Sequence, residues 1–142
     1  MRTPFPDVGS DPTLEFDARP RALVIDDSRT VRLIIGRVLT DLGLNVTEAG
    51  NGREGLDQLH RTPGIGLVLV DWNMPVMDGL EFITAVRARR AYDAVRLVMV
   101  TTETEQEQVL RALGAGANEY VMKPFTREIL VAKLSLLDVF GD

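Results

Sequence analysis

Short uninterrupted apolar runs alternate along the chain with segments whose apolar residues recur every three or four positions. The clearest run is residues 66–70, Gly-Leu-Val-Leu-Val, which contains no polar residue and ends on Asp71. A run of this kind is typical of a strand that is buried on both faces inside a parallel sheet. A second run, residues 22–25, ends in the same way on Asp26 and Asp27.

The same pattern predicts five strands separated by helices. The predicted strands are residues 22–25, 45–49, 66–70, 96–101 and 119–122. The predicted helices follow Ser28, Gly52, Gly79, Thr101 and Thr126, and they end near Gly43, His60, Arg90, Gly114 and Phe140. Ser28 and Thr126 are suitable helix caps. Because each helical segment is long enough for a crossover, we expect an α/β fold: a five-stranded parallel sheet with helices on both faces.

The chain divides into a short tail and one domain. Residues 1–19 contain several prolines and aspartates and show no helix or strand period. We interpret them as a flexible N-terminal tail, with a docking arm that uses Leu14 and Phe16 as the alternative. Residues 20–142 are long enough to form a single domain with its own core.

Composition excludes several classes of protein. The 142 residues include no cysteine, and the net charge is −5 with scattered basic residues. These features exclude disulfides and thiolate metal sites, and they argue against nucleic acid as a partner. No long apolar segment or secretory leader is visible, so we expect no membrane span and a cytoplasmic location.

Polar side chains follow four of the five predicted strands. They are Asp26 and Asp27, Asp71, Thr101 and Thr102, and Lys123. In a parallel sheet all of them lie at one edge, where ligands bind in open α/β folds. Two carboxylates about 4 Å apart repel by ~4 kcal/mol at an effective dielectric constant near 20. A hard cation with oxygen ligands relieves this repulsion, and Mg²⁺ is suitable because it takes few carboxylates and retains waters.

A metal ion, Lys123 and the hydroxyl of Thr101 around one carboxylate would form a site for an incoming phosphoryl dianion. A carboxylate can itself be the nucleophile. We therefore predict that Asp71 accepts a phosphoryl group and that Asp27 is the main metal co-ligand. The alternatives are that Asp26 and Asp27 only cap a helix, that Lys123 is solvated, and that Thr101 only ends a strand.

Four segments carry a family resemblance: Val-Ile-Asp-Asp-Ser (24–28), Val-Asp-Trp-Asn-Met-Pro-Val-Met-Asp-Gly-Leu-Glu (70–81), Val-Thr-Thr-Glu (100–103) and Gly-Ala-Asn-Glu-Tyr-Val-Met-Lys-Pro-Phe (116–125). Together they resemble the receiver domain of bacterial response regulators, and most closely its stand-alone chemotaxis (CheY-like) type. The resemblance covers about residues 21–140. It implies the strand order 2-1-3-4-5.

The resemblance also implies a ligand set. Asp71 would be phosphorylated, and Asp27 and Asp71 would bind Mg²⁺ directly together with the backbone carbonyl of Asn73. Asp26 would act through a bound water, and Mn²⁺ could replace Mg²⁺. Asn73 and Glu103 would tune how fast the acyl phosphate hydrolyses.

The remaining implied roles belong to the switch. Lys123 would pair with the phosphoryl group, which Thr101 and Thr102 would also bind. Tyr120 would change rotamer as Thr101 moves, and the Lys123–Pro124 bond would be cis.

These expectations describe a phosphorylatable two-component switch, not an enzyme. An aspartyl phosphatase would need a general acid where Asn73 stands. His60, the only histidine, has no evident partner and suggests a surface role, so a separate histidine kinase must donate the phosphoryl group. The alternatives are a phosphate sink, a phosphorelay intermediate or a receiver-shaped adaptor in another pathway. Trp72 is expected to pack beside Asp71 and to report on metal binding.

With no segment after residue 142, we expect the output to be a protein contact in chemotaxis or motility. The expected face combines the fourth helix, the fifth strand and the last helix, where Ile129, Leu136, Val139 and Phe140 add apolar surface. The flagellar motor switch is a candidate target, and a phosphatase is a candidate partner.

Overall fold

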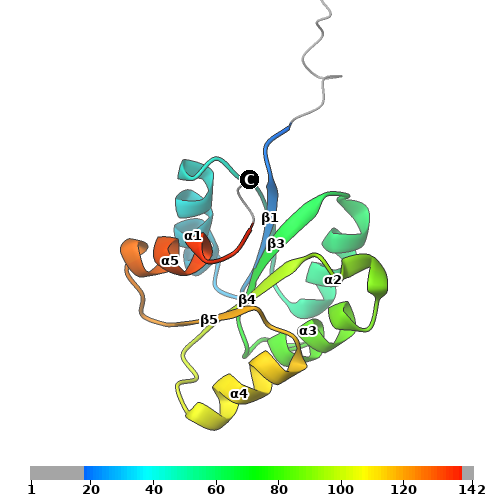
Figure 1. Ribbon diagram of the computed structural model, residues 1–142, viewed down its shortest axis with the longest axis vertical. Helices are drawn as coiled ribbons and strands as arrows, with labels where there is room; N and C mark the ends of the chain where they lie inside the picture. The colour runs from blue at the N-terminus through cyan, green and yellow to red at the C-terminus, as the bar shows by residue number, and fades with distance from the viewer. Residues whose placement is uncertain (1–17, 139–142) are drawn as a thin grey trace, which may run out of the picture.

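Five parallel strands form one sheet in the order β2-β1-β3-β4-β5, as predicted (Figure 1). This computed structural model describes residues 18–138. The strands are β1 (Arg21–Ile25), β2 (Asn45–Ala49), β3 (Ile65–Val70), β4 (Arg96–Thr101) and β5 (Glu119–Met122). The helices are α1 (Arg29–Asp41), α2 (Gly52–Arg61), α3 (Gly79–Arg87), α4 (Gln106–Ala115) and α5 (Arg127–Ser135), and a 3₁₀ turn, η2, spans Arg90–Tyr92.

The helices form two layers around the sheet. Figure 1 shows α1 and α5 on one side and α2, α3 and α4 on the other. Alternate residues of β1 pack into different layers: Ala22 and Val24 face α1 and α5, whereas Leu23 and Ile25 face α2 and α3. Both faces of the central strands are therefore buried, which explains why their sequences are apolar without interruption.

Side-chain caps fix where the helices begin. The Ser28 hydroxyl accepts the Val31 N–H, and Thr126 accepts the Ile129 N–H in the same way at the start of α5. Asp78 accepts the Glu81 N–H while the Glu81 carboxylate accepts the Asp78 N–H. Such caps satisfy amide groups that have no partner inside the helix.

Two predicted helix ends were wrong. The last helix ends at Ser135, not near Phe140, because Leu136 and Leu137 donate to carbonyls three residues back and tighten the final turn. The third helix ends at Arg87, before η2. Val139 and Phe140, and the predicted tail with Leu14 and Phe16, lie outside the described residues apart from positions 18 and 19.

His60 is exposed but does have a partner, contrary to the expectation. Its ring stacks on Tyr92 with 5.6 Å between centroids, and its Nδ1 is hydrogen bonded to the Tyr92 hydroxyl. This pair lies on α2 and η2, next to the amino ends of β3 and β4. It is structural and separate from the acidic edge.

A second feature that the sequence did not reveal is the position of Arg87. Its guanidinium donates to the carbonyls of Gly116 (2.9 Å), Tyr92 (3.0 Å) and Val95 (2.8 Å) and to Asn118 Oδ1 (2.9 Å). One side chain thus joins α3, η2, β4 and the end of α4. Among residues 18–138, no helix is long and apolar enough to cross a bilayer.

Candidate functional site

Three aspartates meet where β1 and β3 end. The Asp71 N–H donates to the Ile25 carbonyl at 2.9 Å, so the pairing of β1 with β3 continues to the last residue before the loop. Oxygens of Asp26, Asp27 and Asp71 all lie within 4.8 Å of one another. Asp26 and Asp71 are buried, whereas Asp27 is exposed. The cap of α1 is Ser28 and not an aspartate, although Asp26 Oδ1 accepts the Ser28 N–H at 2.9 Å.

Lys123 connects two of these carboxylates. Its Nζ lies 2.7 Å from Asp26 Oδ2 and 3.2 Å from Asp71 Oδ2, and its side chain is only 16% exposed. The backbone holds it there, because the Lys123 N–H donates to the Thr101 carbonyl at 2.8 Å. The next peptide bond, Lys123–Pro124, is cis. Lys123 is therefore not a solvated surface lysine.

Burial and charge act in opposite directions on these groups. Burial raises the pKa of Asp71, and the charge of Asp26 adds to that effect, while Lys123 opposes both. Burial alone would lower the pKa of Lys123, but the hydrogen bond that Lys123 donates to Asp26 and the charges of both aspartates more than offset this effect, so the pKa is raised. The single ammonium group of Lys123 contacts two of the three carboxylates, so the cluster keeps a net negative charge.

The donor set fits a hard divalent cation. Three carboxylate oxygens from Asp26, Asp27 and Asp71 lie within 4.8 Å of one another. They provide only oxygen ligands and an excess of negative charge, which is the chemistry that Mg²⁺ requires. Asn73 follows on the same loop, with an exposed side chain.

Asn73 and Glu103 touch across the edge of the sheet. The Asn73 side-chain amide donates to Glu103 Oε2 at 2.9 Å, which joins the loop after β3 to the loop after β4. The sequence indicated a shared role for these residues but not that they are bonded.

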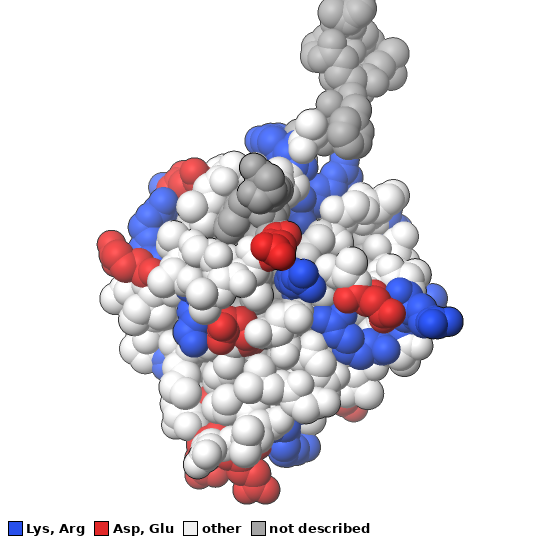
Figure 2. Space-filling model, viewed as in Figure 1, with Lys and Arg blue, Asp and Glu red and all other residues white. Residues whose placement is uncertain are grey.

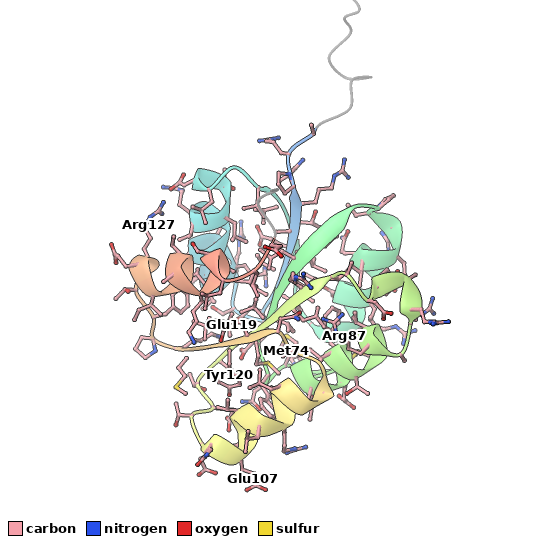
Figure 3. The ribbon with its side chains drawn as sticks, in the orientation of Figure 1. Met74, Arg87, Glu107, Glu119, Tyr120 and Arg127 are labelled. Carbon is pink, nitrogen blue, oxygen red and sulfur yellow. The ribbon has the colours of Figure 1, made fainter. Side chains whose placement is uncertain are left out.

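Thr101 and Tyr120 are both buried beside this second loop. The Thr101 hydroxyl lies 3.4 Å from the Glu103 nitrogen, at the end of β4. The Tyr120 hydroxyl donates to the Glu103 carbonyl at 2.5 Å, and Figure 3 shows Tyr120 between β5 and α4. Burial raises the pKa of Tyr120, and the charges of Glu103 and Asp71 add to this. Tyr120 is buried, whereas Thr102 is exposed.

Three further residues, Trp72, Gly79 and Arg111, surround the position of Asp71. The Trp72 N–H donates to Asp71 Oδ1 at 2.7 Å, and the Arg111 guanidinium of α4 lies 5.7 Å from the centroid of the buried indole. A Cβ at Gly79 would lie 2.1 Å from the Asp71 carbonyl oxygen, so only glycine fits there. The sequence predicted that a helix begins after Gly79, but no signal in it revealed this contact or that of Arg111.

Comparison with known proteins agrees with this geometry. The family model of the response regulator receiver domain matches residues 22–135. A chemotaxis protein CheY homolog of Campylobacter jejuni (strain 81-176) is 45% identical over 122 residues, which are 85% of this chain and 92% of that protein. The chemotaxis protein CheY1 of Helicobacter pylori (strain J99) is 40% identical over 118 residues, 82% of this chain and 95% of that one.

The fold has close solved counterparts. The chemotaxis protein CheY4 of Vibrio cholerae superposes with a TM-score of 0.79 and 35% identity, covering 84% of this chain and 99% of that chain. The similarity therefore extends over the whole sheet and its helices, including the edge that carries the acidic cluster.

Proposed function

We infer that this chain, which belongs to the response regulator receiver domain family, is a phosphorylatable two-component switch in chemotaxis. Asp71 accepts a phosphoryl group from a histidine kinase, and the phosphorylated chain changes its binding to a partner protein. The names of the relatives favour chemotaxis over a phosphate sink, a phosphorelay intermediate or an adaptor. We place the protein in the cytoplasm.

The observation that carries this proposal is the position of Lys123 between Asp26 and Asp71, with Nζ 2.7 Å and 3.2 Å from their oxygens. An oxygen of Asp71 attacks the phosphorus of a phosphohistidine, the P–O bond forms, the P–N bond breaks, and the imidazole nitrogen keeps the electron pair. The Lys123 ammonium and the hydroxyls of Thr101 and Thr102 are suited to bind the transferred oxygens.

The metal would be held by Asp26, Asp27, Asp71 and the Asn73 carbonyl. Bound Mg²⁺ or Mn²⁺ would neutralise charge on the phosphoryl oxygens. The Asn73–Glu103 bridge, with 2.9 Å between amide nitrogen and carboxylate oxygen, lies where it would govern the approach of water and so the lifetime of the acyl phosphate.

The switch follows from the same contacts. Phosphorylation converts a single negative charge into a group of nearly two negative charges. Thr101 and Lys123 are the groups that can move toward it, and each new charge-assisted bond contributes about 1.5–3 kcal/mol. Reversing a two-state population requires about 5.5 kcal/mol, so two or three such bonds suffice. Tyr120 would transmit the change because its hydroxyl is bonded to the Glu103 carbonyl in the loop after Thr101.

The output face would be the surface of α4, β5 and α5. Figure 2 shows mostly uncharged surface over β5 and between α4 and α5. Large apolar side chains are exposed there: Leu110, Leu113, Met122, Ile129 and Leu136. Such a patch fits a protein target, for which the flagellar motor switch is the candidate, and a phosphatase could use the same face.

Fluorescence of Trp72, the only tryptophan, tests the acceptor site. Metal-free protein is titrated with Mg²⁺ and then with phosphoramidate or beryllofluoride. We expect a saturable change in the wild type and in Asp57→Asn, a matched loss of charge on the surface of α2, but no response to either phosphoryl reagent in Asp71→Asn. The proposal would be contradicted if the fluorescence of the wild type did not respond to phosphoramidate or beryllofluoride, or if that of Asp71→Asn did.

The output face has its own test. Ile129→Asp and Leu136→Asp place charges on exposed positions and should leave phosphoramidate labelling intact. We expect both to lose most of the beryllofluoride-dependent capture of the flagellar motor switch protein, whereas Arg61→Asp on α2 retains it. Undiminished capture by both aspartate variants would exclude this face.

A further inference from the structure

The loop that follows Asp71 contains the most strained backbone of the described residues. Val76 has φ 72°, and it is the one non-glycine residue with positive φ within residues 18–138. The Met77 N–H donates to the Pro75 carbonyl at 2.8 Å, two residues back. This is a γ-turn of positive φ, a rare and strained conformation. A β-branched residue is especially unfavourable there.

The surrounding contacts explain the backbone of this turn. The Gly79 N–H donates to the Trp72 carbonyl at 2.8 Å and closes the loop at its base. The Gly52 N–H donates to the Met77 carbonyl at 3.0 Å, and the Met77 side chain packs on the core. These anchors leave three residues, Asn73 to Pro75, before the turn must reverse the chain at Val76.

The same contacts do not explain why the residue at this position is a valine. Glycine adopts positive φ freely and asparagine does so more readily than valine. Val76 is 81% exposed, so packing within the chain offsets little of the strain. Single exposed valines are ordinary, but an exposed valine held at positive φ is not. A contact with a partner molecule would account for both facts.

The donor of the phosphoryl group is the partner that must reach this loop. Its phosphorus has to come within about 3–3.5 Å of an Asp71 oxygen for transfer. The Asp71 side chain is only 11% exposed, and residues 72–78 form the loop directly after it. A protein surface that delivers phosphohistidine to Asp71 therefore meets this loop and the valine at its tip. The loop lies between β3 and α3, so it is not part of the surface formed by α4, β5 and α5.

We propose that Val76 is a specificity-determining contact for the protein phosphodonor, held outward by the strained turn so that it enters an apolar depression beside the donor's phosphohistidine. This inference rests on the proposed function of Asp71. It assigns to Val76 no part in the chemistry, so small phosphodonors should not depend on it.

The test compares two kinds of donor on Val76→Gly, Val76→Asn and Val76→Thr. Phosphoramidate serves as the small donor. The protein donors are the chemotaxis-type histidine kinases of the source organism, autophosphorylated with labelled ATP. We expect phosphoramidate to label all variants at the wild-type rate. Transfer from the cognate kinase to the glycine and asparagine variants should fall about tenfold, mainly through KM, as for a lost buried valine contact.

Stability provides an independent readout. Val76→Gly and Val76→Asn relieve the turn and should melt at a higher temperature than the wild type, so a slower transfer cannot come from unfolding. Val76→Thr keeps a β-branched side chain and the strained turn. Its rate of phosphoryl transfer from the kinase should lie between the rate of the wild type and the rates of the glycine and asparagine variants.

Unchanged transfer from the kinase to Val76→Gly would overturn the inference, and so would an equal loss with both donors. A wild type that phosphoramidate cannot label would instead overturn the proposed function of Asp71.

Discussion

Replacing Asp71 by asparagine should stabilise the metal-free protein. The change removes one charge from the acidic cluster but keeps an oxygen to accept the Trp72 N–H, which now reaches Asp71 Oδ1 at 2.7 Å. Burial raises the pKa of Asp71 above its ordinary 3.8, so the folded state binds this proton more tightly than the unfolded state. Stability therefore falls as pH rises from 3.8 through the folded pKa, and the penalty is complete above it.

The distances set the magnitude. Oxygens of Asp26 and Asp27 lie within 4.8 Å of Asp71. At an effective dielectric constant near 20, the buried pair of Asp26 and Asp71 repels by about 3.5 kcal/mol. Asp27 is exposed, so solvent screens its repulsion to about 1 kcal/mol or less. Lys123 Nζ at 3.2 Å attracts Asp71. That attraction is about 5 kcal/mol on the same scale. The repulsions therefore nearly balance the attraction of Lys123, and the burial of Asp71, which is the largest cause of its raised pKa, decides the sign. The melting temperature of Asp71→Asn should be higher by a few degrees.

Urea denaturation in EDTA and in saturating Mg²⁺ measures both effects. In EDTA we expect Asp71→Asn to be the more stable protein. A ligand that binds only the folded wild type adds about 2.7 kcal/mol at a hundred times its dissociation constant. The asparagine variant lacks one carboxylate ligand and should gain far less, so Mg²⁺ should abolish or reverse the ranking. Asp57→Asn, the surface control, should stay within about 0.5 kcal/mol of the wild type in both buffers.

Two outcomes would refute this reasoning. If Asp71→Asn is less stable than the wild type in EDTA, the attraction of Lys123 outweighs the repulsion within the cluster. If Mg²⁺ stabilises both proteins equally, Asp71 is not a metal ligand. The pH dependence gives a further check, because the difference between the two proteins in EDTA should disappear below the unfolded pKa of 3.8.

Three other substitutions test separate parts of the fold. Thr101→Val should change the free energy of unfolding by less than about 1.5 kcal/mol but reduce the fluorescence response of Trp72 to beryllofluoride, and a full response would exclude a role for the hydroxyl. Arg87→Met should lower the free energy of unfolding in urea by about 2–4 kcal/mol without slowing phosphoramidate labelling of the folded protein. Gly79→Ala places a methyl group 2.1 Å from the Asp71 carbonyl oxygen and should lower the melting temperature most severely; a variant as stable as the wild type would show that the loop can move aside.

The sheet was predictable because its signals are local. Residues 66–70 and 22–25 contain no polar side chain, and the structure buries residues 67–70 and 22–25 in neighbouring strands. Ser28 and Thr126 cap helices as their residue types indicate. Convergence of the acidic residues followed from parallel strands alone, since each strand ends at the same edge.

The missed features depend on distant partners or on the absence of a stop signal. Arg87 looks like an exposed charge at the end of a helix, yet its partners are backbone carbonyls brought together only by the folded chain. His60 likewise meets Tyr92 across 32 positions of sequence. The last helix was predicted to be too long because no glycine or proline follows Ser135 before Gly141. The residue types at its tightened final turn do not indicate that the helix ends there.

The acidic edge is the place where local stability and function conflict. Burial makes the charge of Asp71 unfavourable and raises its pKa, and Lys123, whose Nζ lies 2.7 Å from Asp26 and 3.2 Å from Asp71, offsets only part of that effect. Under the proposed function, replacing Asp71 by a neutral residue would strengthen the metal-free fold but would remove one ligand of the cation and the acceptor of the phosphoryl group. Thr101 lies on β4 and Tyr120 on β5, the two strands beyond β3 in the sheet, and both contact Glu103 in the loop after β4. A change in charge at Asp71 can therefore reach the surface formed by α4, β5 and α5 through these few contacts.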